Sequence, residues 1–179
     1  HSPSRRQRQM CIRDRITIVD YGSGNVLSAQ KSFVKIAKDN NIEVDVLISK
    51  KLNDVKDSTH VVLPGQGAFS TCMNGLKKTD GLIDELCEFA LIKKKPFLGI
   101  CVGMQMLAKM SEENGDHEGL GWIDGQIKLL PGDNLKLPHM GWNLVIPTNS
   151  KYNNLISTKN DYYFVHSYYF DCTNKDNIL

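Results

Sequence analysis

One short stretch, PFLGICVGMQ at residues 96–105, constrains the fold more than any other part of the sequence. Its apolar start predicts a buried strand, and the spacing of Met104, Leu107 and Ala108 predicts a helix directly after it. Cys101 then lies on a sharp turn between strand and helix, where its side chain projects away from the sheet and faces unpaired backbone N–H groups. That position is typical of a nucleophilic cysteine.

Two glycines favour this interpretation of Cys101 over that of a merely buried thiol. Gly99 and Gly103 flank the cysteine two residues away on each side, and close packing at a turn of this kind leaves no room for a Cβ. Cysteines without such neighbours are more often small packing residues. We interpret three others in this way: Cys72, Cys87 and Cys172.

Charge and cysteine usage exclude several classes of protein. The formal net charge of +2 arises from residues 1–15, which hold five arginines and one aspartate, so the remainder is slightly acidic and indicates no nucleic-acid partner. No apolar run approaches the length of a membrane span, and we expect no signal peptide and no membrane association. Five cysteines without Cys-x-x-Cys spacing predict reduced thiols in the cytoplasm, with neither disulfides nor a metal.

The chain divides into a leader and one domain. Residues 1–15 are basic, polar and aperiodic, and we interpret them as a disordered or extraneous leader. Residues 16–179 are long enough for a single α/β domain with a proper core.

Within that domain, strands alternate with helices. Apolar runs predict strands at 16–20, 42–48, 61–63 and 97–100, and helical spacing predicts helices at 26–37 and 82–92. Repeated strand–turn–helix units predict a mainly parallel sheet with helices on both faces. In such sheets the site lies beyond the carboxyl ends of the strands, so three turns should gather there: 22–25, 65–67 and 101–103. After about Gly119 the pattern becomes antiparallel, with strands at 125–130, 141–146 and 162–170.

The glycine turns do not fit a nucleotide site. Gly22-Ser23-Gly24 lacks the third glycine of a dinucleotide fingerprint, and no Gly-Lys-Ser or Gly-Lys-Thr follows any turn. The loop at 65–67 has another use: beside the Cys101 turn, its backbone N–H groups can donate to an oxyanion together with the N–H of Val102. The alternative for this loop is a plain turn at the end of a strand.

Five motifs occur in order: VDYGSGN (19–25), LPGQGAF (63–69), GICVGMQ (99–105), PHMGWN (138–143) and YFVHSY (163–168). Together they resemble the glutaminase subunits of imidazole glycerol phosphate synthase, which are class I glutamine amidotransferases. The third motif is shared by class I glutaminases in general, and the first and fourth narrow the resemblance to this subunit. The resemblance covers residues 16–179 and implies a flavodoxin-like, three-layer α/β/α fold with a mixed, mostly parallel sheet whose last strands are missing.

The resemblance also implies a reaction. Cys101 would attack the side-chain amide of L-glutamine, release ammonia and form a γ-glutamyl thioester that water cleaves to glutamate. The backbone N–H groups of Gln66 and Val102 would form the oxyanion hole, and in relatives the first of these peptides can need to flip. No cofactor and no metal are implied. The remaining positions that match substrate-binding residues are Gly65, Gly67, Gln105, Glu113, Ser167 and Tyr168.

A second implication is a partner. Ammonia would pass to a cyclase subunit that makes imidazole glycerol phosphate in histidine biosynthesis, so we expect a heterodimer. Large apolar residues beside Gly141 also suggest a protein interface, with an ordinary core strand as the alternative. The positions that match the partner-facing surface of the family are Asn25, His139, Met140, Trp142 and Tyr163.

One departure from the family concerns the residue that would act as the catalytic base. A cysteine nucleophile of this type needs a histidine and an acidic residue that orients it, and in this family both come from a Phe-His-Pro-Glu segment near the C-terminus. These 179 residues contain no His-Pro-Glu. His166 matches a position distinct from the catalytic histidine, and His60 should lie at the opposite end of the sheet. We therefore expect a fragment that is inactive by itself because the histidine and glutamate follow residue 179.

Two alternative functions stay open. The chain could be a catalytically silent glutaminase-like subunit that binds and regulates a cyclase. It could also be the glutaminase of a paralogous synthase that makes modified sugars.

Overall fold

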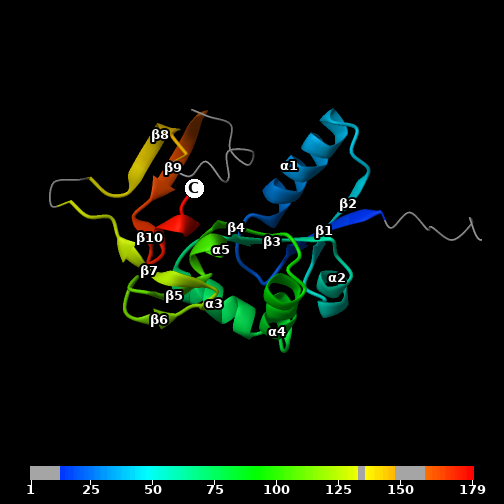
Figure 1. Ribbon diagram of the computed structural model, residues 1–179, viewed down its shortest axis with the longest axis horizontal. Helices are drawn as coiled ribbons and strands as arrows, with labels where there is room; N and C mark the ends of the chain where they lie inside the picture. Colours follow the sequence, from blue (N-terminus) through cyan, green and yellow to red (C-terminus); the bar gives the residue numbers. More distant parts are fainter. Residues whose placement is uncertain (1–12, 133–135, 148–159) are drawn as a thin grey trace, which may run out of the picture.

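The computed structural model describes residues 13–132, 136–147 and 160–179 (Figure 1). Its centre is a four-stranded, wholly parallel sheet in the order β2-β1-β3-β4. The strands are β1 (Asp14–Val19), β2 (Val44–Ser49), β3 (His60–Gly65) and β4 (Phe97–Cys101). All four coincide with predicted strands, and parallel pairing places their carboxyl ends at one edge.

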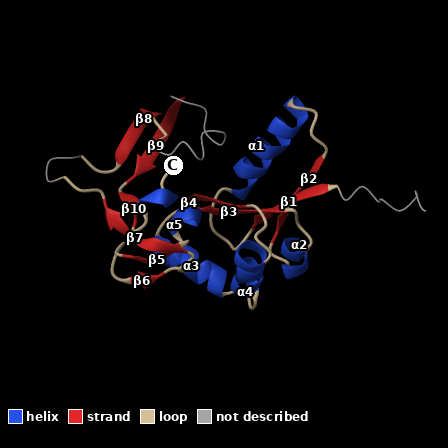
Figure 2. Cartoon of the chain, in the orientation of Figure 1, coloured by secondary structure: helices blue, strands red, loops and turns tan. Residues whose placement is uncertain are grey.

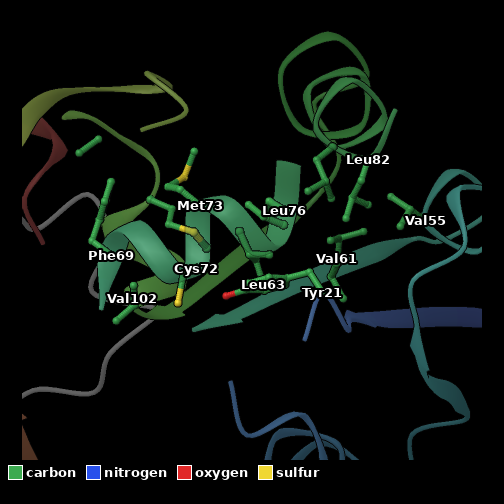
Figure 3. Packing of buried hydrophobic residues seen from close by; sticks show 14 of the residues in the cluster. Tyr21, Val55, Val61, Leu63, Phe69, Cys72, Met73, Leu76, Leu82 and Val102 are labelled. Atoms are coloured by element: carbon green, nitrogen blue, oxygen red, sulfur yellow. The ribbon is translucent and has the colours of Figure 1, made fainter. Parts of the chain in front are cut away.

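Helices cover both faces of this sheet, as predicted (Figures 1 and 2). Helix α1 (Val26–Asp39) lies on one face, and α2 (Leu52–Lys56), α3 (Phe69–Lys77) and α4 (Leu82–Cys87) lie on the other. The core fills the second face, because Val61 and Leu63 of β3 point toward Leu76 of α3 and Leu82 of α4 (Figure 3). Val19 of β1 belongs to the same buried cluster. The three-layer α/β/α prediction is confirmed.

Several element boundaries differ from the predicted ones. Strand β1 begins at Asp14, two residues before the predicted start, because the N–H of Arg15 donates to Thr59 Oγ1 at 2.9 Å and Asp14 pairs with Val44. Asp14 and Arg15 therefore belong to the sheet, and residues 1–12 lie outside the described residues. The predicted helix at 82–92 is α4 followed by a π-helical turn over Glu88–Ile92.

The C-terminal part forms a second sheet and a separate hairpin (Figure 2). The second sheet has the order β10-β7-β5-β6, with β5 (Ala108–Ser111), β6 (His117–Glu118), β7 (Ile123–Leu129) and β10 (Tyr168–Cys172). The hairpin consists of β8 (His139–Val145) and β9 (Asn160–His166). A short 3-10 turn over Lys175–Asn177 follows β10.

The single strand predicted at 162–170 is therefore two strands in different sheets. β9 ends at His166 and β10 starts at Tyr168. The break falls at Ser167, whose carbonyl accepts the N–H of Leu130 at 2.9 Å and so leaves the β8–β9 ladder. The mixed sheet of the prediction is likewise divided into a purely parallel sheet and a second, mixed sheet.

The last points concern an exposed sheet edge and the lengths of the helices. Among the described strands, β4 is an edge of the parallel sheet, and its Leu98 and Ile100 side chains are 48% and 37% exposed. Within residues 13–132, 136–147 and 160–179, no helix is both long and apolar enough to cross a membrane.

Candidate active site

Cys101 lies at the junction of β4 and the short helix α5 (Val102–Gln105), as predicted. Its backbone has φ 56° and ψ −120°, a conformation that a residue with a Cβ rarely adopts, and its side chain is exposed. Such strain is typical of nucleophile turns between strand and helix. Val102 begins the helix, so its N–H has no acceptor within the helix and is free to serve a ligand.

The two flanking glycines are required by packing, which confirms the prediction. A Cβ on Gly99 would lie 2.6 Å from Met104 Cα, and a Cβ on Gly103 would overlap the carbonyl oxygen of Leu63. The turn can therefore close onto β3 only because both positions lack a side chain.

The three predicted turns meet at the carboxyl edge of the sheet. Gly65 is paired with Cys101 in the β3–β4 register, and a Cβ on Gly65 would lie 2.8 Å from the carbonyl carbon of Val102. A Cβ on Gly24 would lie 3.1 Å from the carbonyl carbon of Pro64. The loop at 65–67 therefore packs directly on the backbone that follows the nucleophile.

The helix after Cys101 is shorter than predicted. It ends at Gln105, and Ala108 already belongs to β5. The carbonyls of Met106 and Leu107 accept N–H groups from residues 120 and 122 at 2.8 and 2.9 Å, which replaces the next helical turn. Gln105 is half-buried at the end of this helix.

Glu113 is held near the loop at 65–67 by a hydrogen bond to the start of α3. It follows β5, and its Oε2 accepts the N–H of Phe69, the first residue of α3, at 2.7 Å. Ala68 has no side chain that could cap α3, so the Glu113 carboxylate takes that role and also complements the helix dipole. The carboxylate is thus fixed at the start of α3, just after the loop at 65–67.

Two contacts of the loop were missed by sequence analysis. The hydroxyl of Tyr21 donates to the carbonyl of Pro64, and the Cys72 thiol lies within reach of the Gln66 carbonyl. Cys72 is fully buried and so is a packing residue, as predicted, but it also touches the loop. Neither contact has a local signal in the sequence, because each joins separate elements.

A chain of hydrogen bonds occupies the two histidines of the hairpin. The carbonyl of Tyr168 can only accept, so His166 Nδ1 donates to it at 2.9 Å. His166 Nε2 then accepts from His139 Nδ1 at 2.8 Å, and His139 Nε2 accepts from the Asn143 amide at 2.7 Å. Both rings are therefore engaged in hydrogen bonds, within the hairpin and to β10.

The other predicted residues lie on several elements. Gln66 and Gly67 are at the loop, Tyr168 packs against the main core, and Ser167 lies at the break between β9 and β10. In the described parts of the chain, no hydrogen bond joins Ser167 or Tyr168 to Cys101, so their substrate-binding role stays a prediction.

The predicted partner-facing residues divide between two places. Asn25 caps α1, where its Oδ1 accepts the N–H of Ser28 at 3.1 Å. The others lie on the β8–β9 hairpin, where Met140 and Trp142 are 61% and 71% exposed. Across the ladder from Trp142, the ring of Tyr163 packs edge-on at 5.6 Å.

No group of three or more His, Cys, Asp or Glu side chains suited to a metal ion occurs among the residues that the structure describes. The reactive features of the site are thus the exposed Cys101 thiol, the backbone of the loop at 65–67 and nearby polar side chains.

Comparison with known proteins decides the family. Residues 17–178 match the family model described as "Glutamine amidotransferase class-I". The chain belongs to this family. A solved "Crystal structure of glutamine amidotransferase" shares the fold, with a TM-score of 0.65 at 14% identity over 89% of this chain and 75% of that one.

Similar sequences narrow the place of the chain within the class I glutamine amidotransferases. "Imidazole glycerol phosphate synthase subunit HisH" of Pelagibacter ubique is 46% identical over 87% of this chain and 74% of its own length. The protein of the same name from Rhodospirillum rubrum is 44% identical over 87% and 75%. That of Brucella abortus is 38% identical over 92% and 79%. The chain is therefore a member of the HisH family.

Replacing Glu113 separates its observed contact at the start of α3 from its predicted role in binding the substrate. We expect Glu113→Gln to raise the KM for glutamine about tenfold, because the charge that would attract the substrate's ammonium group is lost, while an oxygen that can cap α3 remains. Steady-state kinetics of the full-length protein check this. Glu112→Gln is the matched control, since Glu112 also accepts a backbone N–H, that of Leu129, at 2.7 Å. Equal KM values in the two variants would contradict a substrate-binding role for Glu113.

Proposed function

We propose that this chain is the glutaminase subunit of an imidazole glycerol phosphate synthase. Cys101 attacks the side-chain amide of L-glutamine, and the ammonia that is released passes to a cyclase subunit. The observation that carries the proposal is the strained, exposed Cys101 with the glycine loop packed on the backbone directly after it. The five motifs, and the names of the similar proteins, support the choice of substrate and partner.

The chemistry follows from the arrangement around Cys101. The thiolate sulfur bonds to the amide carbon, and the carbonyl electron pair moves to oxygen, where the N–H groups of Gln66 and Val102 stabilise it. The intermediate collapses, the C–N bond breaks, and the nitrogen leaves as ammonia after taking a proton. Water then adds to the thioester, the C–S bond breaks, and glutamate and the thiol are released.

The proton transfers in this cycle need a base. Among the described residues, no hydrogen bond joins Cys101 Sγ to a histidine, and His139 and His166 are bonded to each other. The matches cover about three quarters of the length of the HisH relatives, and the test therefore uses a protein of that full length.

Glutamine labelled with ¹⁵N in its side-chain amide tests the reaction and the transfer together. The full-length protein and the cyclase subunit are mixed with this glutamine and the cyclase substrate. We expect glutamate to form and the label to appear in the imidazole product, even when unlabelled ammonium is present in the solvent. Glutamate formation without labelled product would contradict transfer, and no glutamate would contradict the glutaminase function.

The same experiment distinguishes the alternatives. A complex that forms but makes no glutamate would identify a silent binding subunit. Glutaminase activity with a different cyclase-type partner, and none with this one, would identify a paralogous synthase.

A cytoplasmic location is part of the proposal, because reduced thiols suit that compartment.

The partner surface is proposed to include the exposed face of the hairpin. Alternate residues of β8 and β9 point the same way, so Met140, Trp142 and Leu144 share one face with Tyr163 and Val165. All five side chains are at least half exposed. Aromatic and methionine side chains clustered in this way are enriched in protein interfaces.

Trp142→Ala tests this surface. We expect the dissociation constant of the complex to rise by about 10- to 100-fold, because a central tryptophan often contributes about 2 kcal/mol or more to an interface. Isothermal titration calorimetry with the cyclase subunit measures the change. Ile92→Ala is the matched control, since Ile92 is 69% exposed and lies in the π-helical turn after α4, outside the β8–β9 hairpin. A similar affinity for both variants would contradict the assignment of the hairpin.

A further inference from the structure

The Gln66 N–H belongs to the peptide between Gly65 and Gln66. The carbonyls of the two neighbouring peptides, those of Pro64 and Gln66, contact side chains from other elements. On one side, the hydroxyl of Tyr21 donates to the carbonyl of Pro64 at 2.6 Å, and this bond is buried. On the other side, the carbonyl of Gln66 lies 3.5 Å from Cys72 Sγ and 3.5 Å from Ser23 Oγ. The peptide between these anchors carries the Gln66 N–H, which is one of the two oxyanion donors in the proposed reaction.

We propose that Tyr21 is a positioning residue for the oxyanion site and that Cys72 and Ser23 assist it. This inference rests on the proposed glutaminase function and adds what sets the orientation of the Gln66 N–H. Rotation of one peptide plane changes only ψ of the residue before it and φ of the residue after it, so the neighbouring planes can stay fixed. With both neighbours anchored, the middle plane directs its N–H either toward Cys101 or away from it.

Tyr21 is the strongest of the three anchors. Its 2.6 Å bond is at the short end of the range for O–H···O bonds, whereas the 3.5 Å contacts of the Gln66 carbonyl are long. The Tyr21 ring is only 6% exposed and is wedged against α3, where a Cβ on Gly75 would lie 2.9 Å from ring carbon Cδ2. Figure 3 shows Tyr21 beside Leu63 and under α3. A rigid ring holds its hydroxyl in one place.

The hydroxyl also keeps its proton. Burial raises the pKa of Tyr21, and the neighbouring Cys72 and Cys101 thiols raise it further. Tyr21 therefore remains a donor to the Pro64 carbonyl when Cys101 ionises during the reaction.

Tyr21→Phe removes this donor and keeps the ring. In the full-length complex with the cyclase subunit, we expect kcat for glutamine hydrolysis to fall about tenfold, with KM changed by less than about twofold, because oxyanion donors stabilise the transition state more than the substrate. Tyr169→Phe is the matched control, since Tyr169 pairs with Lys128 in the second sheet.

Alkylation of Cys101 by iodoacetamide provides a second measurement. This reaction displaces iodide at a saturated carbon and forms no oxyanion, so it reports only the thiolate and its accessibility. We expect the same rate at Cys101 in wild type and Tyr21→Phe, measured by mass spectrometry of the Cys101 peptide. For the second anchor, we expect Cys72→Ala to lower kcat about threefold and Cys72→Ser, which keeps a donor, to restore it.

The outcomes separate the inference from the proposed function. Equal kcat values for Tyr21→Phe and Tyr169→Phe would overturn the inference and leave the glutaminase function in place. A parallel fall in the alkylation rate would also overturn it, because Cys101 itself would then be displaced. A wild-type complex that makes no glutamate would overturn the proposed function and the inference with it.

Discussion

Replacing Cys101 with alanine is expected to lower glutamine hydrolysis by ~10⁴-fold or more, because no thioester can form without the sulfur. The fold should be unaffected, since the side chain is exposed and alanine removes one atom from it. Glutamate production by the full-length protein in the presence of the cyclase subunit and its substrate measures the effect. The cyclase reaction driven by free ammonium should persist, because it does not use Cys101.

Cys87→Ala is the matched control for this experiment. Cys87 is half-buried at the end of α4, on the core side of the parallel sheet. We expect its loss to leave turnover unchanged and to cost at most about 1 kcal/mol of stability. Glutamine hydrolysis that survives Cys101→Ala would contradict the assignment of the nucleophile.

Gly103→Ala is expected to disrupt both the fold and the site. The added Cβ would overlap the carbonyl oxygen of Leu63, and neither β3 nor α5 can move away without breaking the β3–β4 register. We expect the free energy of unfolding to fall by about 3 kcal/mol, the upper part of the range for overpacked positions. Molecules that remain folded should lose about 100-fold in kcat, because a displacement of about 1 Å at the nucleophile has that effect.

Urea unfolding and steady-state kinetics of the same preparation measure the two losses. Gly121→Asn is the matched control, because Gly121 has φ +69° and open space where a Cβ would lie, and asparagine tolerates that conformation. We expect it to cost less than about 1 kcal/mol and to leave kcat unchanged. A Gly103→Ala variant as stable and active as Gly121→Asn would contradict the role of close packing at the turn.

The active-site turn could be predicted from sequence because all its determinants are local. An apolar run, two glycines and a cysteine within residues 97–103 specify a strand, a tight turn and the position of the thiol. The same holds for the other two glycine turns, since each follows its own strand and parallel pairing then brings the strand ends together.

The length of the helix after Cys101 and the division of residues 162–170 could not be predicted in this way. Helical spacing continues past Gln105, but the carbonyls of Met106 and Leu107 pair with residues 120 and 122. In the same way, alternation continues through Ser167, but β9 pairs with β8 and β10 pairs with β7. In both cases a distant strand competes with the local pattern for the same backbone groups, and tertiary pairing wins.

Local residue patterns were enough to specify the parallel α/β core, the nucleophile turn and the order of the motifs, because each depends on residues that are neighbours in the chain. The side chains that support the loop at 65–67 and the start of α3 were instead set by tertiary packing. Tyr21 meets Pro64 across 43 residues and Glu113 meets Phe69 across 44. A hydrogen bond between such distant residues leaves no periodic or local signal, since it exists only once the sheet has brought the strand ends together.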